Sequence, residues 1–280
     1  MTHKLKANEA RRNALFTLPM GLLAVLLVAL PLIYVMGMAL TTADGQFTLS
    51  NFKGILRADY LMVFLNSLKL AFFTTVISLL IGYPFGYFMA RSGRRVKALL
   101  MLLVIIPFWT SALVRIYGLK ILLQGNGPVN TLLKSLGLIE KNIKFLGSYG
   151  SVLLAMVYCL ISMMILPCHS AVDKMDFTLV EAARDLGSAP WRAFIDVTLP
   201  LTMPGILAGC VLVFVPSVGI FYLSDIMGGG LVLVGNLIRD QLLKVRDWHM
   251  GSAMSMVLIV LTAGVYLIYR KAGGDDLGVF

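Results

Sequence analysis

The sequence predicts an all-α, polytopic membrane protein with six transmembrane helices. Of its 280 residues, 59% are hydrophobic and 14% are charged, and the mean hydropathy is +0.87. Such a composition leaves too little polar surface to cover a soluble globule. Mostly apolar windows of about 18 residues or more, the length that crosses a hydrocarbon core of about 30 Å, recur along the chain. We expect six spans, at Leu15–Leu40, Phe64–Met89, Ala98–Leu123, Val152–Ser170, Thr202–Tyr222 and Ser252–Tyr269.

The first of these spans is expected to be retained in the mature protein. The apolar run that follows Arg11 and Arg12 is longer than the roughly 7 to 15 residues of a signal peptide, and it lacks a clear small-residue cleavage site.

Basic residues in the loops predict the orientation. With the amino terminus in the cytosol, the inner side carries 13 Lys and Arg and the outer loops carry nine. The inner ones form dense clusters in short segments, which is typical of the cytosolic side of a membrane protein. We therefore predict that both termini are cytosolic. The net charge of +10 follows from the same bias and indicates no nucleic-acid partner.

Two outer segments have the pattern of short amphipathic helices. In the first, Pro128 opens a run of leucines and valine at helical spacing, and Gly137 closes it. In the second, Gly235 and Asn236 precede an apolar series interleaved with charged residues, which ends near Arg246.

A polar segment, residues 178–200, separates the fourth and fifth spans, and we call it the elbow. Thr178 and Glu181 fit a capping box, Gly187 fits a C-terminal stop, and Pro190 lies where a second short helix would begin. An apolar stripe at the spacing i, i+4, i+7 is formed by Leu179, Ala183 and Leu186.

The first helix of the elbow has the design of a docking helix. The small side chains of Ala182 and Ala183 allow its backbone to lie deep in a groove, and the stripe supplies apolar contact. Charges on Glu181, Arg184 and Asp185 would fix the register. An ordinary amphipathic helix resting on the membrane has the same pattern, so the pattern alone leaves both interpretations open.

Motifs for enzyme chemistry are absent from the sequence. It contains no Gly-Lys dipeptide, and so no phosphate-binding loop of the G-x-x-x-x-G-K-[ST] type. It also lacks a His-Glu-x-x-His helix and a G-x-S-x-G elbow. Cys159, Cys168 and Cys210 have no metal-ligand or redox spacing and are expected to pack in the interior. We therefore predict a chain that is not an enzyme and cannot hydrolyse ATP through a phosphate-binding loop of its own.

The elbow resembles the cytosolic EAA loop of permease subunits in ATP-binding-cassette importers of the type I, or MetI-like, fold. The resemblance rests on Glu181-Ala182-Ala183, on Gly187, and on Leu199-Pro200, with Val197 where that family commonly has isoleucine. It implies one transmembrane permease domain over residues 1–280, with a cytosolic coupling loop at 173–200. The implied contacts of the ATPase subunit are Leu179, Glu181, Ala182, Ala183, Asp185, Leu186 and Gly187.

Further segments resemble the polyamine branch of these importers, and within it the first permease subunit of spermidine/putrescine systems. They are Ile106–Ser111, Val114–Gly118, Pro200–Gly205, Phe221–Asp225 and Arg246–Trp248. One departure is His249, which stands where proline is expected.

The same resemblance implies the partners and the compartment. The chain would lie in the bacterial inner membrane and form a heterodimer with a homologous second permease. It would work with two ATPase subunits and a periplasmic polyamine-binding protein. No cofactor would bind to this chain, because the ATPase subunits hold ATP and Mg²⁺.

A polyamine carries two or more ammonium groups, so its route needs carboxylates and aromatic faces. Asp225 is the one acidic residue at the outer end of an apolar segment, and Phe221 and Tyr222 precede it by four and three residues. An ionisable group at membrane depth is a functional candidate, although Asp225 could instead meet water or pair with Arg115. Trp109 supplies another aromatic face, unless it serves only for packing or as an interfacial anchor.

Two alternatives remain open on the sequence. The first is a permease of the same class for another small solute, such as an amino acid, a sugar or an oxyanion. The second is a stand-alone secondary transporter or a channel, which normally needs an intramembrane network of acids or histidines.

Overall fold

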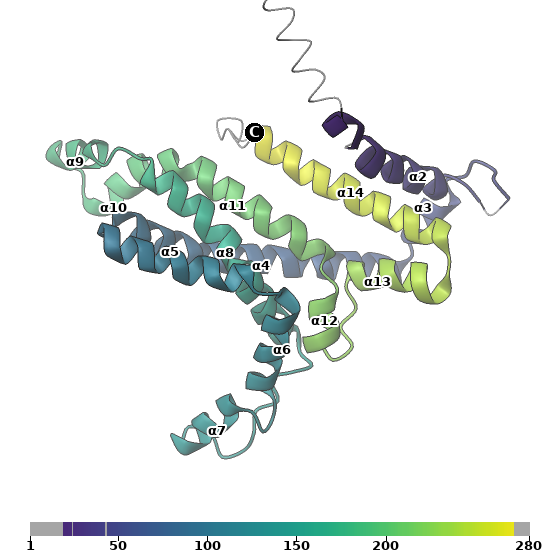
Figure 1. The fold of residues 1–280 in the computed structure, drawn as a ribbon, viewed down its shortest axis with the longest axis horizontal. Coiled ribbons are helices and arrows are strands. Elements are labelled where there is room, and N and C mark those ends of the chain that lie inside the picture. Colours follow the sequence, from purple (N-terminus) through teal and green to yellow (C-terminus); the bar gives the residue numbers. More distant parts are fainter. Residues whose placement is uncertain (1–18, 24, 43, 272–280) are drawn as a thin grey trace, which may run out of the picture. The chain divides into compact units, whose positions relative to one another are not determined.

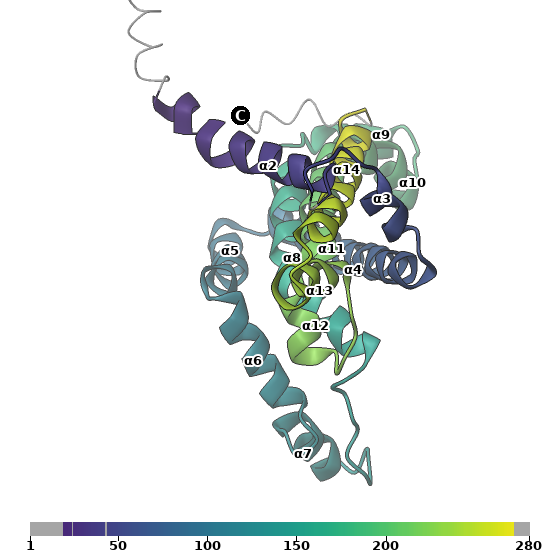
Figure 2. The same ribbon diagram turned by 90° about the vertical axis from the view of Figure 1, so that its right-hand side faces the viewer.

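The computed structural model describes residues 19–23, 25–42 and 44–271. This part of the chain is helical, apart from loops and one isolated antiparallel bridge between Thr41 and Phe47 (Figures 1 and 2). Contacts within the chain divide it into two compact units. One contains the residues up to Ala58 together with Ile238–Val260, and the other contains Asp59–Leu237 with the residues from Leu261 onward.

The larger unit is built around a pair of long helices, α8 and α11, which lie side by side (Figure 1). Small residues allow this close contact, since a Cβ atom at Gly209 would lie 2.6 Å from the Sδ atom of Met164, and one at Gly205 would meet Ala171. The helices of this unit are α4 (Ala58–Arg91), α5 (Arg94–Trp109), α6 (Ala112–Leu123), α7 (Pro128–Ser135), α8 (Tyr149–Asp173), α9 (Thr178–Asp185), α10 (Pro190–Ala193), η2 (Phe194–Thr198), α11 (Leu199–Gly219), α12 (Tyr222–Met227) and α13 (Val234–Asp240), whose last residues pass into the smaller unit.

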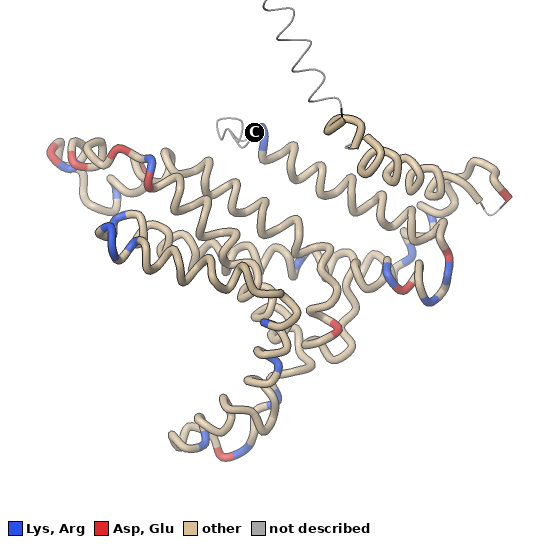
Figure 3. The backbone as a smooth tube through the Cα atoms, in the orientation of Figure 1, with Lys and Arg blue, Asp and Glu red and all other residues tan. Residues whose placement is uncertain are grey.

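The core of the larger unit is apolar and centres on α8. Its fully buried side chains come from helices far apart in the sequence, and include Leu70, Ile116, Val152, Met156, Met164, Val213 and Leu223. Charged residues gather at the helix ends and leave the middles of α5, α8 and α11 uncharged (Figure 3). This distribution fits helices that cross a hydrocarbon layer.

The smaller unit contains η1 (Val25–Ala29), α2 (Leu30–Ala39), α3 (Ser50–Ile55), η3 (Gln241–Val245) and the first half of α14 (Trp248–Lys271). The ring Nδ1 of His249 lies 3.0 Å from the carbonyl oxygen of Met38, which gives the histidine at the unexpected position a structural role. The amide of Asn51 donates to the carbonyls of Ala39 and Thr41. These bonds join segments that are distant in the sequence.

The structure confirms most of the predicted spans. Helices long and apolar enough to cross a membrane occur, among the described residues, at Pro19–Ala39, Ala58–Arg91, Tyr149–Asp173, Pro190–Gly219 and Trp248–Lys271. Residues 15–18 of the first predicted span, and the basic residues before it, lie outside the described residues.

The third span differs from the prediction. Instead of one helix over Ala98–Leu123, two segments, Arg94–Trp109 and Ala112–Ser135, meet at an angle of 98°. Thr110 and Ser111 between them are extended, with ψ angles of 147° and 130°. The Thr110 hydroxyl donates to the carbonyl of Pro107 at 2.7 Å. Such local side-chain bonds compete with helix continuation, whereas hydropathy does not register them. The described residues thus contain up to six candidate spans, if the bent pair is counted as one.

The two outer amphipathic segments are helical as predicted, with one correction. Helix α7 begins at Pro128, and Gly137, with φ of 69°, follows its last turn. Gly235 and Asn236, however, do not precede the second helix but lie buried within α13. The helical run continues as η3 and ends at Arg246, which adopts a left-handed conformation with φ of 62°.

Candidate functional site

The first helix of the elbow forms where the sequence predicts it but is capped differently, and the second is not a separate short helix but the start of the long helix Pro190–Gly219. Thr178 is the first residue of α9 rather than the residue before it, so the predicted capping box with Glu181 is wrong. Instead, the Asp176 carboxylate accepts a hydrogen bond from the Thr178 backbone N–H at 3.0 Å. This bond and a further one from the Thr178 side chain lower the pKa of Asp176 below its ordinary value.

The end of α9 follows the prediction. Gly187 has φ of 90°, its N–H donates to the carbonyl of Arg184, and the N–H of Ser188 donates to that of Ala183. This pair of bonds is the Schellman arrangement, which needs a residue that tolerates positive φ. Pro190 then opens α10, and the helix continues through η2 into α11.

The predicted coupling residues lie mainly on the outward face of α9. Leu179 is 49% exposed and Leu186 is 88% exposed, while Ala183 is half-buried. The other predicted contacts, Glu181, Ala182, Asp185 and Gly187, are exposed. A depression of about 390 Å³ lies beside them, lined by Glu181, Arg184, Asp185, Gly187, Ser188 and Pro190. An apolar ridge and charged groups are thus presented together, as a docking surface requires.

Aromatic rings connect the elbow to α4. Phe177 precedes α9 and Phe194 begins η2, and both rings contact Tyr87 edge-on, with centroids 6.4 and 6.3 Å apart. Phe194 also meets Tyr83 at 6.0 Å. The Arg91 guanidinium lies 5.3 Å from the centre of the Phe177 ring. We call the four rings, Tyr83, Tyr87, Phe177 and Phe194, the aromatic bridge.

A hydrogen bond joins the aromatic bridge to α11. The Tyr83 hydroxyl is hydrogen-bonded to the Thr202 hydroxyl of α11 at 2.9 Å, in the buried interior. Close by, Lys97 of α5 forms an ion pair with Asp173 at the end of α8. A π-helical turn, η2, also lies where the elbow joins α11, and such turns are frequent at functional sites. The elbow is therefore packed onto a connected set of spans.

The second candidate site lies on α12. Phe221, the residue before this short helix, and Tyr222 pack edge to face, with ring centroids 6.4 Å apart and planes at 82°. Asp225, whose backbone N–H donates to the carbonyl of Phe221, is exposed on the next turn. We call Phe221, Tyr222 and Asp225 the outer lip. An exposed carboxylate one helical turn from a pair of packed aromatic rings offers both groups that an organic cation can contact.

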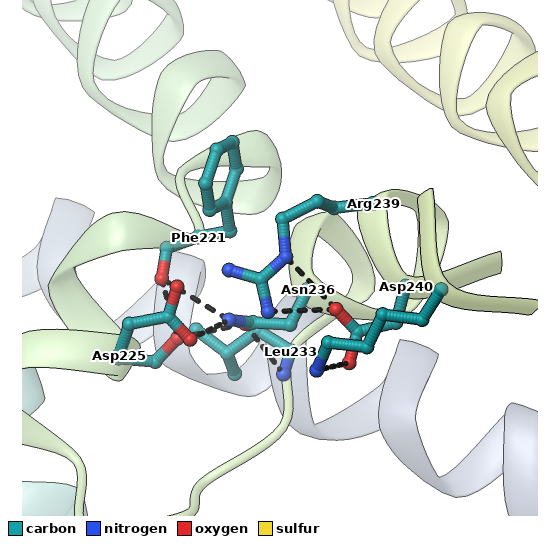
Figure 4. Close-up of polar contacts among 8 residues, drawn as sticks. Phe221, Asp225, Leu233, Asn236, Arg239 and Asp240 are labelled. Atoms are coloured by element: carbon teal, nitrogen blue, oxygen red, sulfur yellow. Dashed lines mark hydrogen bonds and ion pairs between the residues drawn. The ribbon is translucent and has the colours of Figure 1, made fainter. Parts of the chain in front are cut away.

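The neighbours of the outer lip differ from the sequence-based expectation. The Asn236 amide donates to the Asp225 carboxylate at 2.7 Å (Figure 4). Arg115 does not pair with Asp225, and its Nε is buried without a hydrogen-bond partner in the described part of the chain. Trp109 lies at the end of α5 with 84% of its surface exposed, and it makes no ring contact with another described residue. The structure therefore joins three of the four predicted pathway residues by local contacts and leaves Trp109 apart from them.

Sequence reasoning missed Asn236 and the aromatic bridge. The pair Gly235-Asn236 was a visible signal, because a polar amide among the apolar residues at the start of a helix needs partners. For the bridge, the spacing of Tyr83 and Tyr87 by one helical turn placed both rings on one face of α4.

Within the described ranges, no three His, Cys, Asp or Glu residues are grouped so that they could hold a metal ion.

Comparison with known proteins identifies the family. Residues 82–271 match the family described as "Binding-protein-dependent transport system inner membrane component". The chain is 42% identical, over 255 residues, to the "Spermidine/putrescine transport system permease protein PotB" of Escherichia coli (strain K12). This match covers 89% of this chain and 93% of that protein. It is equally identical, over 252 residues, to the protein of that name from Haemophilus influenzae, with 88% of each chain covered. The "Inner membrane ABC transporter permease protein YdcU" of E. coli is 30% identical over 243 residues, covering 82% of this chain and 78% of that protein.

Solved structures support the same fold. A chain of a bacterial ABC transporter involved in the import of the acidic polysaccharide alginate aligns with a TM-score of 0.73 at 18% identity, covering 96% of this chain and 99% of that one. A chain of the MetNI methionine ABC transporter aligns with a TM-score of 0.56 at 15% identity, over 76% of this chain and 93% of that one. These likenesses establish a type I ABC importer permease fold. The chain therefore belongs to the family of inner-membrane components of binding-protein-dependent transport systems, and is a multi-pass inner-membrane permease subunit.

Proposed function

We propose that this chain is the first permease subunit of an ATP-driven importer that moves spermidine or putrescine into the cytosol. The observation that carries the proposal is the 42% identity, over 89% of the chain, to the spermidine/putrescine permease of E. coli. The outer lip supports it, because an exposed carboxylate one helical turn from a pair of packed aromatic rings matches the chemistry of an ammonium-bearing substrate. An oxyanion would be repelled by the same carboxylate.

The chain itself would be non-catalytic. It would pair with a homologous second permease, and two ATPase subunits would bind ATP and Mg²⁺. A periplasmic polyamine-binding protein would deliver the substrate. The docking groove of the ATPase would receive α9, with Leu179, Leu186 and the neighbouring charges as the contact surface. Both termini would lie in the cytosol, on the side of the elbow.

ATP would drive transport through the elbow. Binding of ATP closes the ATPase dimer, the elbow moves with it, and the bundle changes from inward-facing to outward-facing. Nucleotide can shift this equilibrium only if the contacts of the elbow differ between the two states. Substrate then passes from the binding protein to the outer lip and on to the cytosol after ATP hydrolysis.

Reconstitution tests this function directly. The chain, its partner permease, the ATPase and the binding protein are assembled in lipid vesicles, and uptake of labelled spermidine is measured with and without ATP. We expect uptake only with the complete set, and competition by unlabelled spermidine or putrescine but not by amino acids, sugars or oxyanions. Accumulation by the permease chains without the ATPase would overturn the ATP-driven mechanism, and competition by an anion would overturn the substrate class.

A further inference from the structure

The buried amide of Asn236 has a fixed orientation. Only 3% of this residue is exposed, and its side chain makes four hydrogen bonds. The oxygen accepts from the Ser224 hydroxyl at 2.7 Å and from the Leu233 backbone N–H at 3.1 Å. The nitrogen donates to the Phe221 carbonyl at 3.2 Å and to the Asp225 carboxylate at 2.7 Å.

These partners leave no freedom to exchange the two ends of the amide. A backbone N–H can only donate and a carbonyl can only accept, so the nitrogen must face Phe221 and Asp225. Because a donor bonded to a carboxylate forms a charge-assisted bond, the contact with Asp225 is among the strongest of the four. The amide therefore joins the backbone of Phe221 to the charge of Asp225 (Figure 4).

The start of α13, which carries Asn236, is held in place. The Ser67 hydroxyl of α4 accepts a hydrogen bond from the Val234 N–H at 2.8 Å in the buried interior. Gly235 packs so closely on Gly219 that an added Cβ atom would collide with the Gly219 carbonyl. Asn236 thus projects from a segment anchored to both α4 and the end of α11.

Helix α12, which carries Asp225, is anchored at its last residue as well. The Met227 carbonyl accepts hydrogen bonds from the Ser151 hydroxyl at 2.9 Å and from the Gly147 N–H at 2.8 Å. Helix α12 is consequently fixed to the start of α8 at its last residue and to Asn236 at its first turn. A charged group built on such a support is preorganised and loses little conformational entropy when it meets its ligand.

We propose that Asn236 is a positioning residue for transport, which holds the Asp225 carboxylate in the outer lip where an ammonium group of the substrate passes. The inference rests on the proposed function, because it assigns Asn236 a role through Asp225. It adds a residue that touches the carboxylate and not the substrate.

A double-mutant cycle in the reconstituted complex tests this role. Asn236→Ser removes the amide N–H groups that reach Asp225 and Phe221, and leaves a shorter hydroxyl without adding charge, whereas Asp225→Asn removes the carboxylate. We expect Asp225→Asn to lower spermidine uptake per assembled complex about tenfold and Asn236→Ser to lower it about fivefold. If Asn236 acts through Asp225, the double variant should transport at about the rate of Asp225→Asn alone, because mutations in one interacting unit are not additive.

Asn130 provides the matched control. It is equally buried, with 1% exposed, and its amide donates to the carbonyls of Gln124 and Ile143 and accepts from the Ile143 N–H. Those bonds brace the outer loop and involve no carboxylate. Asn130→Ser should reduce the amount of assembled complex at most, and leave uptake per complex within about twofold of wild type. Any fall in uptake caused by Asn130→Ser should add fully to the fall caused by Asp225→Asn.

The outcomes separate the two claims. If Asp225→Asn takes up spermidine as wild type does, the outer lip does not lie on the substrate route. The positioning role of Asn236 is then refuted as well. Reduced uptake by Asp225→Asn, with a further independent loss on adding Asn236→Ser, would leave the route intact and overturn the positioning role alone. Should Asn236→Ser fail to assemble, Asn236→Gln takes its place in the same cycle, because it keeps the amide but moves it by one methylene group. Equal uptake by the double variant and by Asp225→Asn alone supports positioning, and a further independent loss refutes it.

Discussion

Gly187 ends α9 with φ of 90°, in a conformation that ordinary residues avoid. No atom outside its immediate neighbours lies within 4 Å of an added Cβ, so Gly187→Ala meets a conformational cost and no steric clash. That cost is about 1 to 2 kcal/mol. We expect Gly187→Ala to lower spermidine uptake several-fold and Gly187→Asn to lower it less, because asparagine tolerates positive φ better.

Gly264 of α14 is the control for this pair. It also has open space around its Cα, but its φ is not positive, so Gly264→Ala should leave uptake unchanged. Uptake and ATP hydrolysis are measured together on equal amounts of complex. Equal activity of Gly187→Ala and wild type would show that the left-handed end of α9 has no part in transport.

We expect the stability of α9 to depend on pH through the carboxyl group of Asp176. Its pKa is lowered in the folded protein by the hydrogen bond from the Thr178 N–H. A carboxyl with a lowered folded-state pKa stabilises the fold fully above its ordinary pKa, near 4, and this contribution is lost as the pH falls through the lowered value.

We therefore expect α9 to gain hydrogen-exchange protection between about pH 3 and pH 5 in wild type. In Asp176→Asn the protection should vary less over this range, because an asparagine oxygen still accepts the bond but does not titrate. At neutral pH the two proteins should exchange alike. An identical pH profile for both would contradict the assignment of this cap.

At the scale of the elements, the aromatic bridge is the connection between the elbow and the spans. Edge-to-face pairs contribute about 0.5 to 1.5 kcal/mol each, and Phe194 takes part in two of them. If the bridge carries the motion of the elbow to α4, Phe194→Leu should lower uptake per ATP hydrolysed several-fold while the complex still assembles. Tyr87→Phe keeps the ring and should retain coupling.

Phe72 and Phe73 of α4 serve as the reference for this prediction. They form a comparable edge-to-face pair with centroids 5.8 Å apart, but both are exposed and neither ring belongs to the aromatic bridge. Phe73→Leu should leave uptake per ATP unchanged. If it lowered the ratio as much as Phe194→Leu does, the effect would be a general response to loss of an aromatic side chain.

The elements also show what the sequence could and could not predict. Apolar length identified the spans, and Gly187 and Pro190 marked the ends of the elbow helices, because these signals are local. The bend at Thr110-Ser111 escaped prediction, since it depends on hydroxyl bonds within an apolar run. The contact between Asn236 and Asp225 escaped it because it joins two short helices across a loop, and only the folded chain brings them together.

At the scale of the whole molecule, the proposed orientation places the elbow in the cytosol and the α7 segment outside. The native cysteines favour a labelling test, because Cys159 and Cys168 are buried and Cys210 is half-buried. A membrane-impermeant maleimide should therefore react little with the wild-type protein. New cysteines at exposed leucines on the two sides then report the orientation, and suitable positions are Leu138, which is 67% exposed, and Leu186, which is 88% exposed.

We expect Leu138→Cys to be labelled in intact spheroplasts, and Leu186→Cys only after the membrane is opened. The same experiment reports docking, because Leu186 lies on the face of α9 proposed to meet the ATPase. Adding the ATPase subunit to opened membranes should slow labelling of Leu186→Cys at least severalfold and leave Leu138→Cys unaffected. Labelling of Leu186→Cys in intact spheroplasts would reverse the orientation. An unchanged rate with the ATPase present, at a concentration that supports uptake, would show that this face of α9 remains open in the complex.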